Sequence, residues 1–408
     1  MRLDWWLIGI CSSRAFSGII VMTYAAALPV LQQEWALSAA VAGSIASGYQ
    51  ISYAISLVVF SALADRIGPK PLFIRSLQAA AVSSIAFAIF ARGYLSALIL
   101  YILVALSLGG TYTTALMILA DRYPVERRGM ATGWFIASTS LGYALSLLIS
   151  GIAIPIGGYK LSFMATCSGP LLALIMAWIT LRKTQVSVVA RHKEQRFTEE
   201  VLGNKPAMLL IGSYTFHSWE LLGMWAWTPA FLTACLALGG TGGLNSAGQG
   251  AQISAAFHLT GLIASFSMGM LSDRLGRARV IIMMAGISTV CSFVFGWTIG
   301  WPFVIIVGIG LIYGFSSLGD SPVLSTALTE VVRPSYLGSA FGLRSLLGFS
   351  AGAVSPLVFG FILDLTNPLR AQQTYYSNWG WAFSMLGAGG VVAVWAAYRF
   401  GRIRIEKE

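Results

Sequence analysis

Twelve long apolar runs follow one another along the chain and limit its fold more than any other feature. A helix that crosses a bilayer needs about 20 apolar residues, and each run reaches or slightly exceeds that length. Because lipid offers no hydrogen bonds to an exposed backbone, such runs are stable as helices. We therefore predict an all-α membrane protein with twelve transmembrane helices, embedded in the lipid bilayer. The runs are Trp6–Val30, Ser38–Leu63, Leu72–Ala91, Leu95–Ala120, Met130–Ile154, Leu161–Leu181, Ala207–Leu238, Ala251–Leu271, Val280–Gly300, Pro302–Leu328, Leu337–Leu363 and Trp379–Phe400.

Charged residues are too few to cover a soluble protein of this size. Of the 408 residues, 10% are charged and 57% are hydrophobic, whereas soluble proteins have about 25% and roughly 45–50%. The net charge of +11 would suit a nucleic-acid partner only if the cations shared one polar face. They lie instead in short groups between the apolar runs, so we expect no nucleic-acid partner.

The cations also predict the orientation in the membrane, because Lys and Arg in short loops stay on the cytoplasmic side. With the N-terminus inside, most of them fall into cytoplasmic loops, and the opposite loops hold only Arg92, Lys160 and Arg370. We expect both termini in the cytoplasm and the protein in the inner membrane of the cell.

The second half of the chain repeats features of the first half, which favours two parallel copies of a six-helix unit. The matched pairs are Pro29 and Pro229, Asp65 and Asp273, Asp121 and Glu330, Gly129 and Gly338, and Gly151 and Gly360. We predict an N-terminal six-helix bundle at residues 1–181 and a cytoplasmic linker at 182–206. A C-terminal six-helix bundle at 207–400 and a cytoplasmic tail at 401–408 complete the chain.

A short polar motif occurs after the second run and again after the eighth. The second copy reads Gly269-Met-Leu-Ser-Asp273-Arg274-Leu-Gly276-Arg277. In the first copy, around Asp65, Ser61 and Pro69 stand in place of the leading glycine and the last arginine. The motif resembles the loop motif of the major facilitator superfamily of secondary transporters. The resemblance covers the whole chain and implies that family's fold of two six-helix bundles.

The resemblance also implies a latch that holds the cytoplasmic side closed, in which acidic residues of other helices pair with the arginines of the loop. An aspartate near a helix N-terminus is favoured by the helix dipole, and glycine allows helices to approach closely. Because the first copy is incomplete, we expect the second copy to be more sensitive to mutation. The expected latch residues are Asp65, Arg66, Gly68, Asp121, Gly269, Asp273, Arg274, Gly276, Arg277 and Glu330.

The chain lacks sequence motifs of two groups of transporters in this family, which narrows the range of expected functions. Drug–proton antiporters of this family carry an arginine four residues before a glycine in span four, where this chain has Ala105 and Gly109. Their Gly-Pro-x-x-Gly-Gly element is absent from span five, which reads Ser140-Leu-Gly-Tyr-Ala-Leu. The glycine motif of nitrate transporters is absent as well. Drug antiport and nitrate exchange are therefore disfavoured.

Ionisable side chains inside a span are costly and usually mark a functional site. His217 and Glu220 are three residues apart and share a helix face, and a carboxylate beside an imidazole suits proton transfer. We assign His217, Glu220 and Asp320 to proton coupling. The alternative for Glu220 is a hydrogen-bonded pair that only joins helices. The ionisable residues within the spans are Arg14, His217, Glu220, His258, Asp320 and Arg344.

Arginine suits an anionic substrate because its planar fork offers two parallel hydrogen bonds to a carboxylate. Arg14 and Arg344 are therefore candidate substrate contacts. The alternatives are snorkelling to the interface and, for Arg344, an ion pair with Asp320. Aromatic residues complete the expected substrate site: Tyr112, Tyr143 and Trp219.

These residues predict a proton-coupled symporter that takes up a small organic anion, such as a carboxylate, by alternating access. With Arg14, Arg344, Glu220 and Asp320 all charged the site is neutral, and protonation of Glu220 leaves it positive for a monoanion. The alternatives are an efflux pump for drugs or hydrophobic compounds, a metal or metabolite importer, and a sensor. The sequence carries no nucleophile–base motif, phosphate-binding loop or metal-type cluster, so we expect no enzyme activity, cofactor or metal. A monomer suffices.

Overall fold

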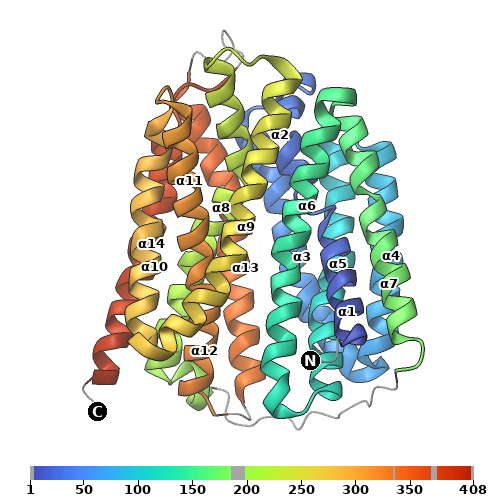
Figure 1. The fold of residues 1–408 in the computed structure, drawn as a ribbon, viewed down its shortest axis with the longest axis vertical. Helices are drawn as coiled ribbons and strands as arrows, with labels where there is room; N and C mark the ends of the chain where they lie inside the picture. The colour runs from blue at the N-terminus through green and yellow to red at the C-terminus, as the bar shows by residue number, and fades with distance from the viewer. Residues whose placement is uncertain (1–3, 185–197, 334–335, 369–374, 406–408) are drawn as a thin grey trace. The chain divides into compact units, whose positions relative to one another are not determined.

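The computed structural model describes residues 4–184, 198–333, 336–368 and 375–405. Within these residues every regular element is a helix and none is a strand (Figure 1). Eleven of the helical stretches in the described residues are long and apolar enough to cross a membrane. The prediction of an all-helical membrane protein is confirmed, but the count differs from the predicted twelve. Residues 185–197 of the predicted linker and 406–408 of the predicted tail lie outside the described residues.

The difference in the count arises in one stretch, Arg127–Leu181. It has 55 residues, more than twice the roughly 20 that one crossing needs. It comprises α6 (Val125–Thr166) and α7 (Ser168–Leu181). Inside α6, Gly157 and Gly158 have non-helical backbone angles, and Gly158 has a φ of +63°, which glycine adopts without a steric penalty. Division of the stretch at these glycines would give twelve spans.

The chain forms two compact units. Unit 1 comprises Met1–Leu37, Gly48–Arg191 and Gly243–Ala255, and unit 2 comprises Ser38–Ser47, His192–Gly242 and Ala256–Glu408. Besides α6 and α7, unit 1 holds α1 (Trp5–Gly18), α2 (Thr23–Glu34), α4 (Pro69–Phe90) and α5 (Tyr94–Arg122). Unit 2 holds η1 (Thr198–Leu202), α8 (Lys205–Leu238), α10 (Arg277–Phe295), η2 (Gly296–Thr298), α11 (Phe303–Gly319), α12 (Ser321–Val331), α13 (Leu337–Leu365) and α14 (Gly380–Ile405).

Two helices are shared between the units. Helix α3 (Ala39–Ile67) begins in unit 2 and continues in unit 1, whereas α9 (Gly243–Leu275) begins in unit 1 and continues in unit 2. Each unit therefore contains the first turns of a helix whose remainder belongs to the other unit.

Equivalent positions of the two halves make equivalent contacts. In unit 1, the Ser13 hydroxyl donates to the carbonyl oxygen of Ala173 at 2.9 Å. In unit 2, the hydroxyl of Ser213 donates to the carbonyl oxygen of Ala393 at 3.0 Å. Ser13 and Ser213 correspond when Pro29 is matched to Pro229, so these contacts are those expected of a duplicated unit.

The surface of the described helices carries large apolar side chains. Val304 is 77% exposed and Ile156 is 74% exposed. Many large apolar side chains exposed to water would be unfavourable, whereas lipid tails are themselves apolar and can surround such side chains. This surface agrees with the predicted bilayer environment.

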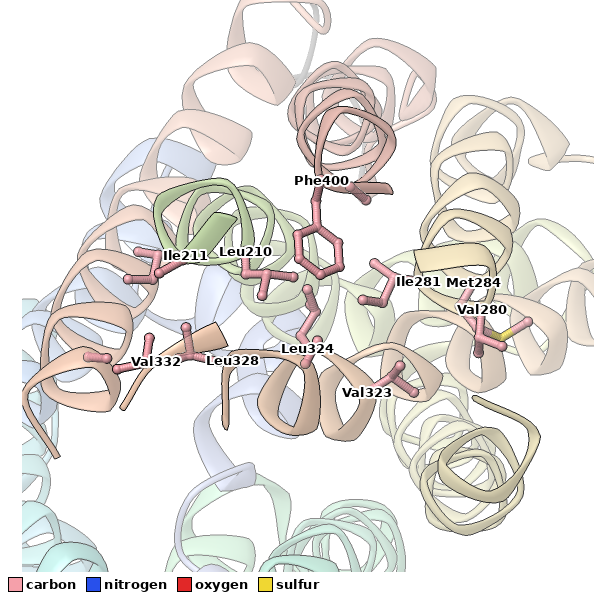
Figure 2. Packing of buried hydrophobic residues seen from close by; sticks show 14 of the residues in the cluster. Leu210, Ile211, Val280, Ile281, Met284, Val323, Leu324, Leu328, Val332 and Phe400 are labelled. Atoms are coloured by element: carbon pink, nitrogen blue, oxygen red, sulfur yellow. The ribbon is translucent and has the colours of Figure 1, made fainter. Parts of the chain in front are cut away.

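One apolar cluster in unit 2 fixes the position of α12. Figure 2 shows the ring of Phe400, from α14, pointing toward Leu210 of α8 and Leu324 of α12. Val323, Leu324, Ala327 and Leu328 form the buried stripe of α12. With that stripe packed, Ser321 and Ser325, which are one turn apart, lie on a neighbouring stripe of the same helix.

Candidate functional site

A break between α11 and α12 places Asp320 in the interior of unit 2. Pro322 is in the first turn of α12, and its missing N–H cannot bond to the carbonyl of Leu318. The Ser265 hydroxyl, which donates to the carbonyl oxygen of Gly261 at 2.9 Å, lies 3.5 Å from that of Leu318. The interruption leaves Asp320, at the junction of the two helices, 1% exposed. Broken helices of this kind form binding sites in many transporters.

His217, on α8, is the partner of Asp320. Its Nδ1 lies 3.1 Å from Oδ1 of Asp320, and its Nε2 lies 2.8 Å from the hydroxyl oxygen of Ser321. The His217 side chain is 4% exposed. Both ring nitrogens therefore have polar neighbours from the start of α12, and an imidazole paired with a carboxylate in this way can accept and release a proton.

Arg344, on α13, contacts the same helix one turn further along. Its Nη1 donates to the hydroxyl of Ser325 at 2.6 Å. The guanidinium carbon lies 4.2 Å from the ring centroid of Tyr214 and 4.8 Å from that of Phe341. Stacking of a cation on aromatic faces is favourable by about 0.5–2 kcal/mol. The buried Nε of Arg344 has no hydrogen-bond partner in the described part of the chain.

The predicted alternative for Arg344, an ion pair with Asp320, does not occur among the ion pairs of the described residues. Asp320 pairs with His217 instead. Tyr214 connects the two groups, because its ring centroid lies 5.8 Å from that of His217 and its face supports Arg344. Unit 2 thus holds a contiguous cluster of Arg344, Tyr214, His217 and Asp320, which we name the α12 cluster.

Glu220 lies outside the α12 cluster. Its Oε1 accepts hydrogen bonds from Ser288 at 2.6 Å and from Ser292 at 2.7 Å, both on α10. A side chain on Gly390 of α14 would approach its Oε2 to 2.8 Å. Within the described residues no hydrogen bond joins Glu220 to His217, and the bonds to α10 fit the alternative of a carboxylate that joins helices. Residues three apart are offset by about 60° around a helix, which lets one face α12 and the other face α10.

Trp219 also points away from the α12 cluster. Its indole nitrogen donates to the carbonyl oxygen of Met385 on α14 at 3.4 Å. A Cβ on Gly389 would lie 2.4 Å from its ring, so the indole packs directly against the backbone of α14. The sequence placed Trp219 with the substrate, whereas this packing gives it a role in joining α8 to α14.

Arg14 is the buried cation of unit 1. It is 8% exposed, and its Nε donates to the hydroxyl of Thr139 at 2.9 Å. Its guanidinium carbon lies 5.2 Å from the ring centroid of Tyr112 and 5.7 Å from that of Phe135. Tyr143 follows Thr139 by one turn on α6. Among the ion pairs of the described residues, none joins a carboxylate to Arg14.

Three of the predicted latch residues, Asp273, Arg277 and Glu330, are in contact in unit 2, with Arg277 between the two acids. Its Nη1 lies 2.5 Å from Oδ1 of Asp273 and also donates to the hydroxyl of Ser272. Its Nε lies 2.9 Å from Oε1 of Glu330, as the sequence predicted. Arg274 is exposed. One arginine thus joins the end of α9 to the end of α12.

The two copies of the motif share a backbone turn but differ in the residue that follows it. Gly68 and Gly276 both have φ 89° and ψ 145°, a conformation that favours glycine. Pro69 follows Gly68 where Arg277 follows Gly276, so the first copy lacks the arginine that pairs with Asp273 in the second copy. Arg66 and Asp121 are exposed.

Gly269 does not have the role that the sequence suggested for it. A Cβ at this position would meet no atom within 4 Å, so the glycine does not permit a close helix approach. Ser61 occupies the corresponding position in the first copy, which agrees with a site that tolerates a side chain.

We predict that Asp273→Asn lowers the transport rate about three- to fivefold, whereas Asp65→Asn changes it less than twofold. The effect is modest because Asp273 is 63% exposed and solvent weakens such ion pairs. Arg277→Gln should have the larger effect, since it removes three contacts together. Initial uptake rates in proteoliposomes, normalised to protein, measure these changes. Equal losses for Asp65→Asn and Asp273→Asn would contradict the asymmetry.

A second prediction concerns Glu220. In Glu220→Gln, the amide oxygen can still accept from Ser288 and Ser292, so we expect uptake within about twofold of the parent. Glu220→Ala leaves two buried hydroxyls without their acceptor, which costs about 1–3 kcal/mol and should lower the melting temperature in detergent. Loss of pH-driven uptake in Glu220→Gln, with unchanged melting, would show that the carboxylate itself carries the proton.

Several residues of the site could not be assigned from the sequence. Ser321, Ser325 and Phe135 carry no charge and resemble many other residues of the spans. Tyr214 had a usable signal, because it precedes His217 by three residues and therefore shares its helix face. Pro322 also had one, since a proline inside an apolar run marks a helix break.

Known proteins resemble the chain in both sequence and fold. The family model described as Major Facilitator Superfamily matches residues 10–244 and 236–407. A gallate transporter of Pseudomonas putida is 25% identical over 384 residues, covering 86% of this chain and 83% of the relative. A hexuronate transporter of Bacillus subtilis is 24% identical over 402 residues, covering 93% and 90%.

Among solved structures, that of a mutant of the nucleoside transporter NupG superposes with a TM-score of 0.75 at 14% identity. The match covers 97% of this chain and 99% of that chain. This superposition supports the assignment of the fold. The match to the family model extends over nearly the whole sequence. The chain is a multi-pass membrane transporter and belongs to the Major Facilitator Superfamily.

Proposed function

We propose that the chain is a proton-coupled symporter that takes up a small organic acid by alternating access, in the inner membrane of the cell. Gallate and hexuronate, the substrates in the names of two relatives, are both carboxylates. The proposal rests on the α12 cluster, in which α12 contacts both the guanidinium of Arg344 and the proton-accepting His217. Twelve spans, cytoplasmic termini and a monomer are part of this proposal.

The charges of the α12 cluster explain how proton and anion would move together. With His217 neutral, Arg344 and Asp320 balance each other. When the pair of His217 and Asp320 takes up a proton, the cluster gains one positive charge. A monoanion is then favoured, and by linkage the bound anion favours protonation to the same degree. In this proposal the pair of His217 and Asp320, and not Glu220, carries the proton.

Arg14, in unit 1, is a second candidate contact for the anion. A buried guanidinium without a carboxylate partner is unfavourable in a membrane, so its presence favours an anionic ligand. The nearby hydroxyl of Thr139 and the ring of Tyr112 hold the guanidinium in place. Its remaining N–H groups can donate to a carboxylate in the usual forked geometry.

The test is uptake into proteoliposomes that contain the purified protein. Radiolabelled benzoate, gallate and glucuronate are the probes, each with and without an imposed inward proton gradient. We expect one or more of these acids to accumulate only when the outside is acidic, with dissipation by a protonophore. Accumulation that ignores the gradient would rule out proton coupling, and no uptake of any carboxylate would rule out the substrate class.

A further inference from the structure

Within unit 2, a carboxylate of α13 binds the first turn of α3. The backbone N–H of Ala39 donates to Oδ1 of Asp364 at 2.9 Å, and that of Ala40 donates to Oδ2 at 2.8 Å. Both oxygens of one carboxylate are therefore bonded to the N-terminus of a helix. The unpaired N–H groups and the partial positive charge of that terminus favour a bound anion.

The hydroxyl of Tyr376 supports this contact by donating to Oδ1 of Asp364 at 2.8 Å. Tyr376 is 3% exposed and belongs to the segment between α13 and α14. Asn367 holds the residues that follow Tyr376, because its amide oxygen accepts from the backbone N–H groups of Ser377 and Asn378. The hydrogen bond from Tyr376 thus positions Asp364 independently of its contact with α3.

The two backbones come close beside the carboxylate. A Cβ on Gly360 of α13 would lie 2.2 Å from the carbonyl oxygen of Ala39, and one on Gly43 would lie 2.3 Å from that of Pro356. We name the contact of Asp364 with Ala39 and Ala40, including this packing, the α3 clasp. It fastens the segment Ser38–Ser47 to unit 2.

Unit 1 contains the matching arrangement without the acid. The first turns of α9 pack on α6, where a Cβ on Gly151 would lie 2.7 Å from the carbonyl oxygen of Gly248. Gly151 corresponds to Gly360 in the repeat, and by the same match Pro155 corresponds to Asp364. The side chain of Gln252 donates to the carbonyl oxygen of Gly151 at 3.1 Å. Only one of the two equivalent contacts is therefore held by a charge.

We propose that Asp364 is a gating residue, whose clasp on α3 holds the transport path closed on the face opposite the N-terminus. Helix α3 starts at that face, because α1 and α2 make one crossing before it. It begins in unit 2 and continues in unit 1, so a movement of one unit against the other must either bend α3 or open the clasp. The clasp opens in each transport cycle and sets how often that face is accessible.

A buried thiol reports this opening without a substrate. Ser47 is 5% exposed, and its hydroxyl has no hydrogen-bond partner in the described residues, so Ser47→Cys changes little. The rate at which a membrane-impermeant maleimide modifies this position in oriented vesicles measures access from that face. The parent protein, with its four native cysteines, supplies the background.

We expect Asp364→Asn to raise the modification rate about five- to tenfold. The amide has one acceptor oxygen where the carboxylate places one on each N–H group, and it lacks the negative charge that the helix N-terminus favours. Tyr376→Phe should raise it less, and Asp364→Glu should restore much of the parent rate. Ser377→Ala, in the same segment but outside the clasp, should have no effect. Asp273→Asn, which weakens the latch on the other face, should lower the rate.

General loosening of the protein would instead raise the rate in every variant, Asp273→Asn included. That result, or an unchanged rate in Asp364→Asn with a normal melting temperature, would overturn the gating role. Should Asp364→Asn fail to fold, Tyr376→Phe tests the same contact. Because no substrate is used, the outcome does not depend on the proposed transport of organic acids.

Discussion

Replacement of Arg14 by alanine is expected to abolish saturable uptake of organic acids. Arg14 is 8% exposed, and among the ion pairs of the described residues it has no carboxylate partner. Truncation of one member of a desolvated charge pair costs about 2–5 kcal/mol, so the apparent affinity for the anion should fall at least about thirtyfold. Isothermal titration of the purified protein with the transported acid, together with initial uptake rates, measures both quantities.

Matched variants separate anion binding from helix packing at this position. Arg14→Lys keeps the charge but loses the forked geometry, so binding should recover only in part. Arg122→Ala removes another arginine that stacks on a ring, that of Trp6 at 4.6 Å, but at an exposed position. It should bind normally. Full activity of Arg14→Ala would assign Arg14 to structure alone. Arg344→Ala should also weaken binding.

Much of the fold could be predicted because it depends on local and repeated patterns. Hydropathy over about 20 residues reports the helices directly, and the duplicated motif around Asp65 and Asp273 indicated two related halves. The pairing of Arg277 with Glu330 followed from the resemblance to a family. The count of spans was less certain, because a glycine pair divides one helical stretch of 55 residues.

The partners of buried polar groups could not be predicted in the same way. Glu220 and His217 share a helix face in the sequence pattern, yet Ser288 and Ser292 bind the first and Asp320 binds the second. Which neighbouring helix lies against each side chain depends on tertiary packing. Asp364 carried no signal at all, because an acid near the end of an apolar run resembles an ordinary interfacial charge.

Replacement of Asp320 by asparagine is expected to uncouple transport from the proton gradient. The amide cannot take up a proton, and His217 loses the carboxylate that lies 3.1 Å from its Nδ1. The α12 cluster then keeps the charge of Arg344 in every state and can still bind an anion. We therefore expect pH-driven accumulation to fall to the background, at least about tenfold, while exchange of internal for external substrate continues.

Exchange in the absence of a gradient is the decisive measurement, because it needs substrate movement but no net proton release. Glu220→Gln is the matched control, since it neutralises the neighbouring buried carboxylate, which binds Ser288 and Ser292, and should keep accumulation. If Asp320→Asn accumulates substrate normally, His217 and Asp320 do not carry the proton. If Asp320→Asn loses exchange as well, and its melting temperature is normal, Asp320 is required for movement of the anion itself. The charge balance of the α12 cluster then controls binding of the anion rather than its coupling to the proton.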